Sequence, residues 1–152
     1  MSVCGDYLII DKTELLNTAD RTLGSIDFAL RRRFVDIYIN SNENELIDST
    51  KTECDISLAD LLKKINSKLV ETLRNNELVI GQTIFYNESI FQDSVYYWSN
   101  ENLEDLFNYK LLSIIEDYCN KESNKVNEIV GDKLSQRKVG TDFITSITEY
   151  IS

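Results

Sequence analysis

The chain of 152 residues contains no proline, so its helices can run without the commonest helix breaker. Apolar side chains recur at helical spacing in three segments, which predicts helices at residues 57–74, 103–118 and 125–134. The first pattern is the most regular, and Ser57 or Asp55 is its expected N-cap. Its predicted buried face carries Leu58, Leu61, Leu62, Ile65, Leu69 and Leu73.

The segments on either side of these helices are less regular. Residues 23–33 show helical spacing, and the β-branched and aromatic run at 34–39 predicts a strand. Residues 7–10 are apolar enough for a second strand, and residues 143–151 favour a short helix. The polar stretch 40–55 is the expected boundary between two parts of the chain. The pattern as a whole predicts a helix-dominated α+β fold.

Charge and composition exclude several classes of function. Sixteen Lys and Arg stand against 26 Asp and Glu, and the net charge of −10 disfavours binding to DNA or to anionic membranes. Histidine is absent, which excludes a Ser-His-Asp triad, a Cys-His pair and histidine-ligated zinc. Cys4, Cys54 and Cys119 have neither metal-ligand nor disulfide-framework spacing, so we expect no metal site and reduced thiols in a cytoplasmic protein. The sequence shows no signal-peptide pattern and no apolar run long enough for a membrane span.

Three consecutive arginines, Arg31, Arg32 and Arg33, are the strongest candidate for a site. Clustered guanidinium groups repel one another, and their planar donors suit phosphate oxygens. The alternative is a solvated basic helix end that is favourable to the helix dipole. Asp20 and Arg21 lie upstream in the run Asn17-Thr18-Ala19-Asp20-Arg21, and they could equally form a local cap and ion pair.

Together the run NTADRTLGSIDFALRRRF resembles the McrB-type GTP-dependent restriction subunits of the AAA+ class. In that family an MNTADRS-like run and an ALRRRF-like run occur at this separation, and the match covers residues 16–34. The resemblance implies that Asn17 is the first sensor, which orients the attacking water at the γ-phosphate. It also implies that arginines among Arg31, Arg32 and Arg33 reach the nucleotide of a neighbouring subunit as fingers, and that Asp20 and Arg21 lie near the nucleotide or the subunit interface.

A weaker resemblance to the helical lid of the same family continues to about residue 135. Residues 65–69 correspond to an INERI-like helix, residues 80–85 to an IGHSYF-like turn, and residues 110–118 to a KIIPLLQEYF-like helix. Gln82 stands where the family tends to have histidine, and the third segment lacks the family's proline. The resemblance therefore implies a lid after the core remnant.

The phosphate-binding parts of such a module are not found in the sequence. None of the five glycines belongs to a Walker A loop followed by Lys-Ser/Thr, and no apolar strand ends in the paired acids of a Walker B motif. We therefore expect the C-terminal part of an AAA+ module, starting just before the first-sensor strand, that binds no GTP or ATP alone. Before Asn17, either residues 8–10 form a strand followed by a loop, or the start of the chain is a remnant spliced to a degraded gene.

Two functions follow from these expectations. In the first, residues 1–45 are the remnant of an AAA+ core, 46–134 are the helical lid, and 135–152 are a tail of a McrB-like nucleoside triphosphatase from a modified-DNA restriction system. The complete family module uses GTP or ATP with magnesium and assembles into a ring of AAA+ subunits. In the second, the chain is a non-catalytic interaction module that binds or modulates a complete ring. We expect no direct contact with nucleic acid from this segment.

The aromatic residues between 85 and 98 offer a further possible site, a platform for base stacking. Stacking platforms need flanking cations to hold the nucleic-acid backbone. The sequence has no Lys or Arg between Arg74 and Lys110. We therefore expect these rings to belong to the core of the lid, packed on the helix that starts at Leu103.

Overall fold

A computed structural model describes residues 42–152, which belong to one compact unit, Asn40–Ser152. The elements predicted at residues 7–10, 23–33 and 34–39 lie outside the described residues. The helices are α3 (Glu45–Ser49), α4 (Leu58–Leu73), α5 (Asn100–Asp105), α6 (Leu112–Tyr118), α7 (Ser123–Ser135) and α8 (Gly140–Ile151). Between and beside them lie the 3₁₀-helices η2 (Gln82–Phe85) and η3 (Glu88–Ile90), the π-helix η4 (Leu106–Leu111), and the strands β1 (Thr50–Thr52), β2 (Phe91–Gln92) and β3 (Val95–Trp98).

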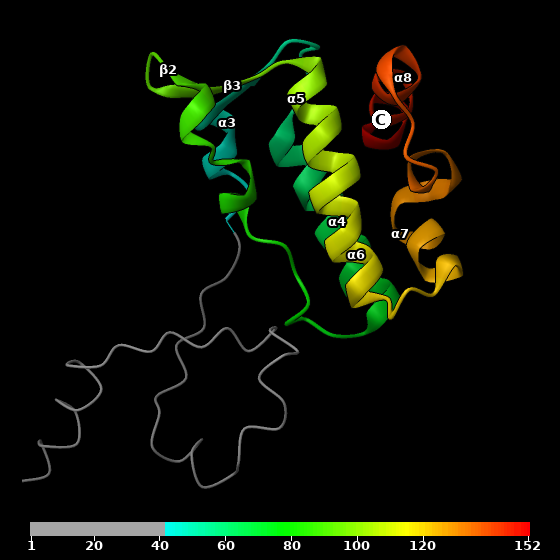
Figure 1. The fold of residues 1–152 in the computed structure, drawn as a ribbon. Helices are drawn as coiled ribbons and strands as arrows, with labels where there is room; N and C mark the ends of the chain where they lie inside the picture. The colour runs from blue at the N-terminus through cyan, green and yellow to red at the C-terminus, as the bar shows by residue number, and fades with distance from the viewer. Residues whose placement is uncertain (1–41) are drawn as a thin grey trace, which may run out of the picture. The chain divides into compact units, whose positions relative to one another are not determined.

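The helix-dominated α+β fold is confirmed. In Figure 1, α5, η4 and α6 form one long rod that crosses in front of α4, with α7 and α8 on one side and the small sheet with α3 on the other. The contacts of α7 with α4 and α6, and of α8 with α4 and α5, close the core between these helices. The domain boundaries predicted at residues 45 and 134 stay a prediction, although α8 belongs to the same compact unit as α4.

Helix α4 forms as its apolar spacing predicts. The Ser57 hydroxyl accepts a hydrogen bond from the Asp60 amide at 3.2 Å, so Ser57 and not Asp55 is the N-cap. Arg74 ends the helix in the left-handed conformation, with φ of 52°. The predicted face is buried except at Leu73, which is half-buried and packs against the core.

The helix predicted at residues 103–118 is present but contains a π-helical turn. In an α-helix the Leu112 amide would donate to the Asn108 carbonyl; here it donates to the Phe107 carbonyl instead. The Asn108 carbonyl accepts a hydrogen bond from Nε of Arg137 at 3.2 Å. The Asn108 side chain, which is 3% exposed, donates to the Lys138 carbonyl at 2.9 Å. The π-turn at Asn108 is therefore held by hydrogen bonds to Arg137 and Lys138, in the connection between α7 and α8.

The two C-terminal helices follow the sequence prediction, with one interruption. Gly131 has φ of 81° and ψ of 158°, so α7 is kinked at a residue that carries no Cβ. The short helix expected at residues 143–151 is α8, which begins three residues earlier, at Gly140. Phe143 of α8 packs against Phe107 of the rod, with ring centroids 5.6 Å apart.

The small sheet has the strand order β1-β3-β2, with β1 parallel and β2 antiparallel to β3. The polar stretch 40–55, expected only as a boundary, contains α3 and the edge strand β1. Phe85 and Trp98 are buried edge to face, and the Trp98 indole donates to the Phe85 carbonyl at 3.3 Å. These two rings belong to the core as expected, whereas Phe91 and Tyr97 are about half exposed.

Tyr150 near the end of α8 yields a prediction about pH. Its hydroxyl donates to the Ile129 carbonyl at 2.8 Å, and burial raises the pKa of Tyr150 to about 12. The folded pKa lies above the unfolded value of about 10, so the stabilisation is complete below pH 10 and is lost as pH rises through 12. We expect Tyr150→Phe to lower the free energy of unfolding by about 1 kcal/mol at neutral pH and to flatten its decline between pH 10 and 12.

Urea unfolding followed by circular dichroism across this pH range measures both effects. The matched control is Tyr109→Phe, because Tyr109 is 74% exposed. An equal alkaline decline in wild type and Tyr150→Phe would contradict the assignment.

Candidate functional site

The residues singled out by the sequence lie outside the described part of the chain. The first-sensor candidate Asn17, the pair Asp20 and Arg21, and the three arginines Arg31, Arg32 and Arg33 all precede residue 42. Their roles therefore stay predictions. The structure does describe the three segments that resemble the lid, at residues 65–69, 80–85 and 110–118.

Asn66 on α4 joins two of those segments. The side chain is 6% exposed, and its Oδ1 accepts a hydrogen bond from the Ile80 amide at 2.8 Å. Its Nδ2 donates to the Ile80 carbonyl at 2.9 Å and to the Glu43 carboxylate at 2.8 Å. One buried amide thus satisfies both backbone groups of Ile80 and fixes residues 80–85 against α4.

Gln82 extends this arrangement to the start of the described chain. Its Oε1 accepts from the Asn42 amide at 3.1 Å, and its Nε2 donates to the Glu45 carboxylate at 3.2 Å. The Asn42 side chain donates to the other Glu45 oxygen at 3.0 Å. We call Asn42, Glu43, Glu45, Asn66 and Gln82 the junction cluster.

The chemistry of the junction cluster is that of a clamp. Its two carboxylates receive amide donors, and two of its three side-chain amides, those of Asn66 and Gln82, both donate and accept. Gln82, at the position where the resembling family tends to have histidine, does both without titrating. The cluster can therefore fix residues 42–45 against α4 and the turn at residues 80–85. It contains no pair of a nucleophile and a general base.

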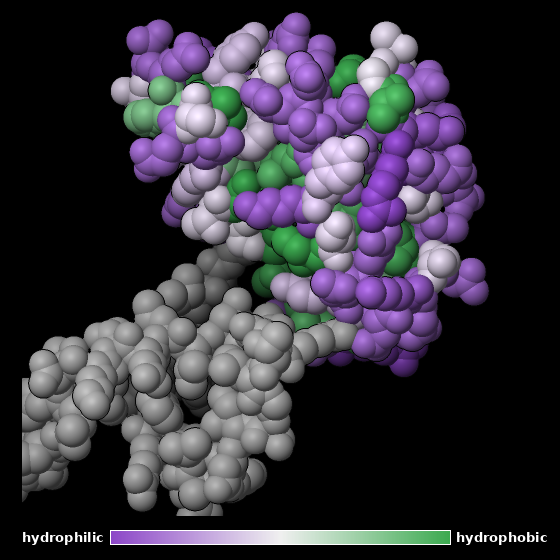
Figure 2. Space-filling view, in the orientation of Figure 1, coloured by the Kyte–Doolittle hydropathy of each residue, from purple (hydrophilic) through white to green (hydrophobic). Residues whose placement is uncertain are grey.

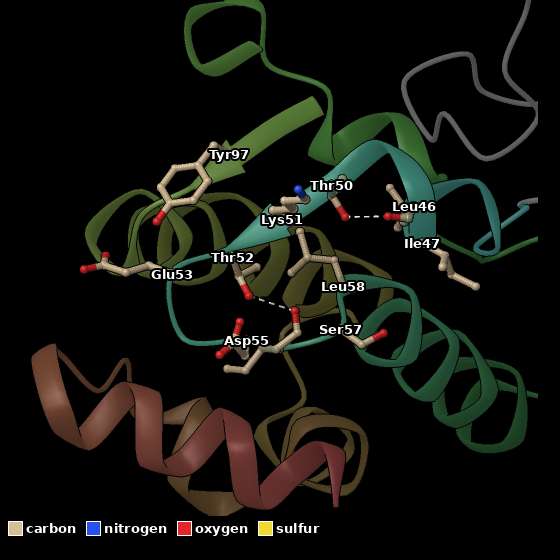
Figure 3. Close-up of a pocket in the computed structure, with 11 residues that line it drawn as sticks. Leu46, Ile47, Thr50, Lys51, Thr52, Glu53, Asp55, Ser57, Leu58 and Tyr97 are labelled. Carbon is tan, nitrogen blue, oxygen red and sulfur yellow. Dashed lines mark hydrogen bonds between the residues drawn. The ribbon is translucent and has the colours of Figure 1, made fainter. Parts of the chain in front are cut away.

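A cavity in the described part of the chain lies between β1 and the segment that leads into α4. It has a volume of about 530 Å³ and is open to solvent. Figure 3 shows Lys51, Glu53 and Tyr97 on one side of it and Asp55 and Ser57 on the other. The remaining lining residues are Leu46, Ile47, Thr50, Thr52, Ile56 and Leu58.

The two threonine hydroxyls in this cavity donate to backbone carbonyls. Thr52 Oγ1 donates to the Ile56 carbonyl at 2.9 Å, and Thr50 Oγ1 donates to the Leu46 carbonyl at 2.6 Å, as the dashed lines in Figure 3 show. Neither hydroxyl is paired with a general base. Residues 42–152 contain no group of three or more acidic or cysteine side chains arranged to hold a metal ion.

The sequence did not predict the contacts of Arg137 that hold the π-turn. The Arg137 guanidinium pairs with the Glu116 carboxylate at 2.8 Å while its Nε reaches the Asn108 carbonyl. The hydrogen bond to Glu116 raises the pKa of Arg137 above its ordinary value. Arg137 also has φ of 51°, in the left-handed region. Arginine rarely adopts this conformation, so its identity in the sequence did not indicate it.

Comparison with known proteins identifies no relative: no family model, no curated protein and no solved structure matches the chain. None of the helices formed by residues 42–152 is long and apolar enough to cross a membrane.

Proposed function

We propose that the chain is the C-terminal part of a McrB-like AAA+ nucleoside triphosphatase from a modified-DNA restriction system. The observation that carries the proposal is the sequence run at residues 16–34. Asn17 occupies the first-sensor position, arginines among Arg31, Arg32 and Arg33 act as fingers on a neighbouring subunit, and Asp20 and Arg21 lie near the nucleotide or the subunit interface. GTP or ATP with magnesium is held by a complete module in the same ring.

The packing of residues 42–152 supports the part of this proposal that concerns the lid. Two segments of weak resemblance that are 14 residues apart, at Asn66 and Ile80, are joined by a pair of buried hydrogen bonds. The third segment contributes Leu111, Leu112 and Ile115 to the same core. Segments that share one rigid unit can move together as a lid over a nucleotide.

A second candidate is a non-catalytic module that binds a complete AAA+ ring and modulates it. The observation in its favour is the sequence itself, in which no Walker A loop or Walker B strand occurs. In this case Arg31, Arg32 and Arg33 still face a neighbouring subunit. The two candidates differ in the effect on turnover: the first completes a catalytic site, and the second leaves turnover unchanged or inhibits it.

Both candidates predict that the chain alone binds no nucleotide. Phosphate recognition of this type needs the backbone amides of a glycine-rich loop and its lysine, and the sequence has no such loop. Isothermal titration calorimetry with GTP or ATP and magnesium should show no heat of binding. A micromolar dissociation constant would contradict both candidates and would point to a nucleotide site of another kind.

A further inference from the structure

Strand β1 lies at the edge of the small sheet, so only one of its two sides is paired with another described strand. The Glu53 amide donates to the Trp98 carbonyl at 2.9 Å, which shows that the Glu53 amide faces β3. Backbone groups of alternate residues in a strand face opposite sides. Those of Lys51 therefore also face β3, and those of Thr50 and Thr52 face the free side of β1.

Two of the four backbone groups on this free side have a partner within the unit. The Thr50 amide donates to the Leu46 carbonyl, and the Thr52 carbonyl accepts from the Asp55 amide at 3.3 Å. The Thr50 carbonyl and the Thr52 amide have no hydrogen bond to another described residue. Thr52 is only 7% exposed, and the great majority of buried backbone groups in proteins are paired. The free side of β1 therefore lacks a partner that supplies one donor and one acceptor.

The cavity between β1 and the start of α4 offers space for such a partner. Thr50 and Thr52 line it, and it is open to solvent (Figure 3). A free acceptor and a free donor on a strand edge match the backbone of an extended peptide, which binds by adding a strand. The side chains of an extended peptide point alternately in two directions. One set faces the side of Lys51 and Tyr97, and the other set faces Asp55 across the cavity.

The side chains around the cavity favour one kind of peptide. Tyr97 is 45% exposed, so an apolar side chain of the peptide can cover its ring, and Lys51 beside it disfavours a basic side chain there. Asp55 is exposed and takes part in none of the ion pairs between described residues, so it favours a basic side chain. Figure 2 shows a face of the unit on which hydrophilic side chains predominate, and the net charge of −10 also favours a basic peptide over an acidic one.

A second copy of β1 fits this edge poorly. In antiparallel pairing about a two-fold axis, the Thr52 amide of each copy meets the Thr50 carbonyl of the other, which places Lys51 directly opposite Lys51. Like charges directly opposite one another destabilise a pair of strands. We propose that the free side of β1 binds an extended segment of a partner protein in which apolar and basic side chains alternate. The proposal uses only described residues and does not depend on the nucleotidase proposal.

A fluorescent hexapeptide of alternating Val and Lys, with both ends blocked, tests the charge preference. Its fluorescence anisotropy with the full chain should show binding about tenfold tighter than that of the matched peptide of alternating Val and Glu. Asp55→Asn should reduce this preference by about threefold, because an exposed charge contributes modestly. The control Asp93→Asn should not reduce it. Asp55 and Asp93 are both exposed and both have positive φ, which asparagine tolerates, so the two substitutions are matched.

Hydrogen exchange and N-methylated peptides test the strand pairing itself. Saturating Val–Lys peptide should slow exchange of the Thr52 amide by about tenfold or more, measured by NMR on the full chain. N-methylation of the peptide at all Val or at all Lys residues removes the amides of one edge, so one form should lose binding and the other should keep it. A Val–Lys peptide that does not bind, or two methylated forms that behave alike, would overturn the proposal. Thr52 exchange that bound peptide leaves unchanged would also overturn it, since the edge would then be unused or already covered by another segment or a second copy.

Discussion

Replacing Asn66 with alanine is expected to lower the free energy of unfolding by about 3 kcal/mol or more. The substitution removes three hydrogen bonds and leaves the buried amide and carbonyl of Ile80 without the Asn66 side chain. A typical hydrogen bond contributes about 1 kcal/mol net, but a buried group left unpaired costs its desolvation, about 1–3 kcal/mol. The Glu43 carboxylate also loses a donor. The expected loss is large because one substitution leaves two buried backbone groups of Ile80 without their hydrogen-bond partner.

Urea unfolding at neutral pH measures this loss, with Asn76→Ala as the control because Asn76 is exposed. Asn66→Asp separates the contacts further, since an ionised carboxylate can accept from the Ile80 amide but can donate to neither acceptor. We therefore expect Asn66→Asp to be nearly as damaging as Asn66→Ala. A loss below about 1 kcal/mol for Asn66→Ala would show that the junction cluster contributes little to stability.

The helices were predictable because their signal is local. The spacing of Leu58, Leu61 and Ile65 defines one face of α4, and Ser57 supplies a cap within one turn of it. Rings that pack in the core were also predictable in part. Phe85 and Trp98 are buried, as expected of large apolar side chains, and the exposure of Phe91 follows from its place beside the hairpin turn.

The sheet and the π-turn could not be predicted in the same way. Strands of two to four residues are too short for alternation to show, and β1 pairs with a strand more than 40 residues further along the chain. The π-turn depends on Arg137, which takes the Asn108 carbonyl from 29 residues away. Both features arise from tertiary contacts that override local preference.

The candidate site was likewise predictable only in part from the sequence. The motif at residues 16–34 is a sequence signal, and its residues precede the described part of the chain. The junction cluster gave one signal that went unused: Asn66 is a polar residue on the apolar face between Ile65 and Leu69, and a buried amide needs partners. Its partner Ile80 could not be identified from the sequence, because the hydrogen bonds go to the backbone of Ile80. Every residue has such backbone groups, so the side-chain pattern does not single one out.

The second large effect concerns the three arginines. Arg32→Ala and Arg33→Ala should change the stability of the chain alone by less than about 1 kcal/mol, as exposed charges usually do. In a mixed assembly with a complete McrB-like GTPase, the same substitutions should lower GTP turnover by on the order of 10³-fold or more, as loss of an arginine finger does. Asn17→Ala is the matched control: a first sensor acts on nucleotide in its own subunit, and this chain is expected to hold none.

The most direct test of the proposed function is steady-state GTP turnover by such a mixed assembly. The chain is added in equal amount to the complete partner, as wild type or with Arg31, Arg32 and Arg33 all changed to alanine. Pull-down of the partner by each form of the chain first establishes that both enter the assembly. The proposal predicts GTP turnover with the wild-type chain and a large loss of turnover with the triple variant. Equal turnover with both forms would contradict it and would make the three arginines a solvated basic segment.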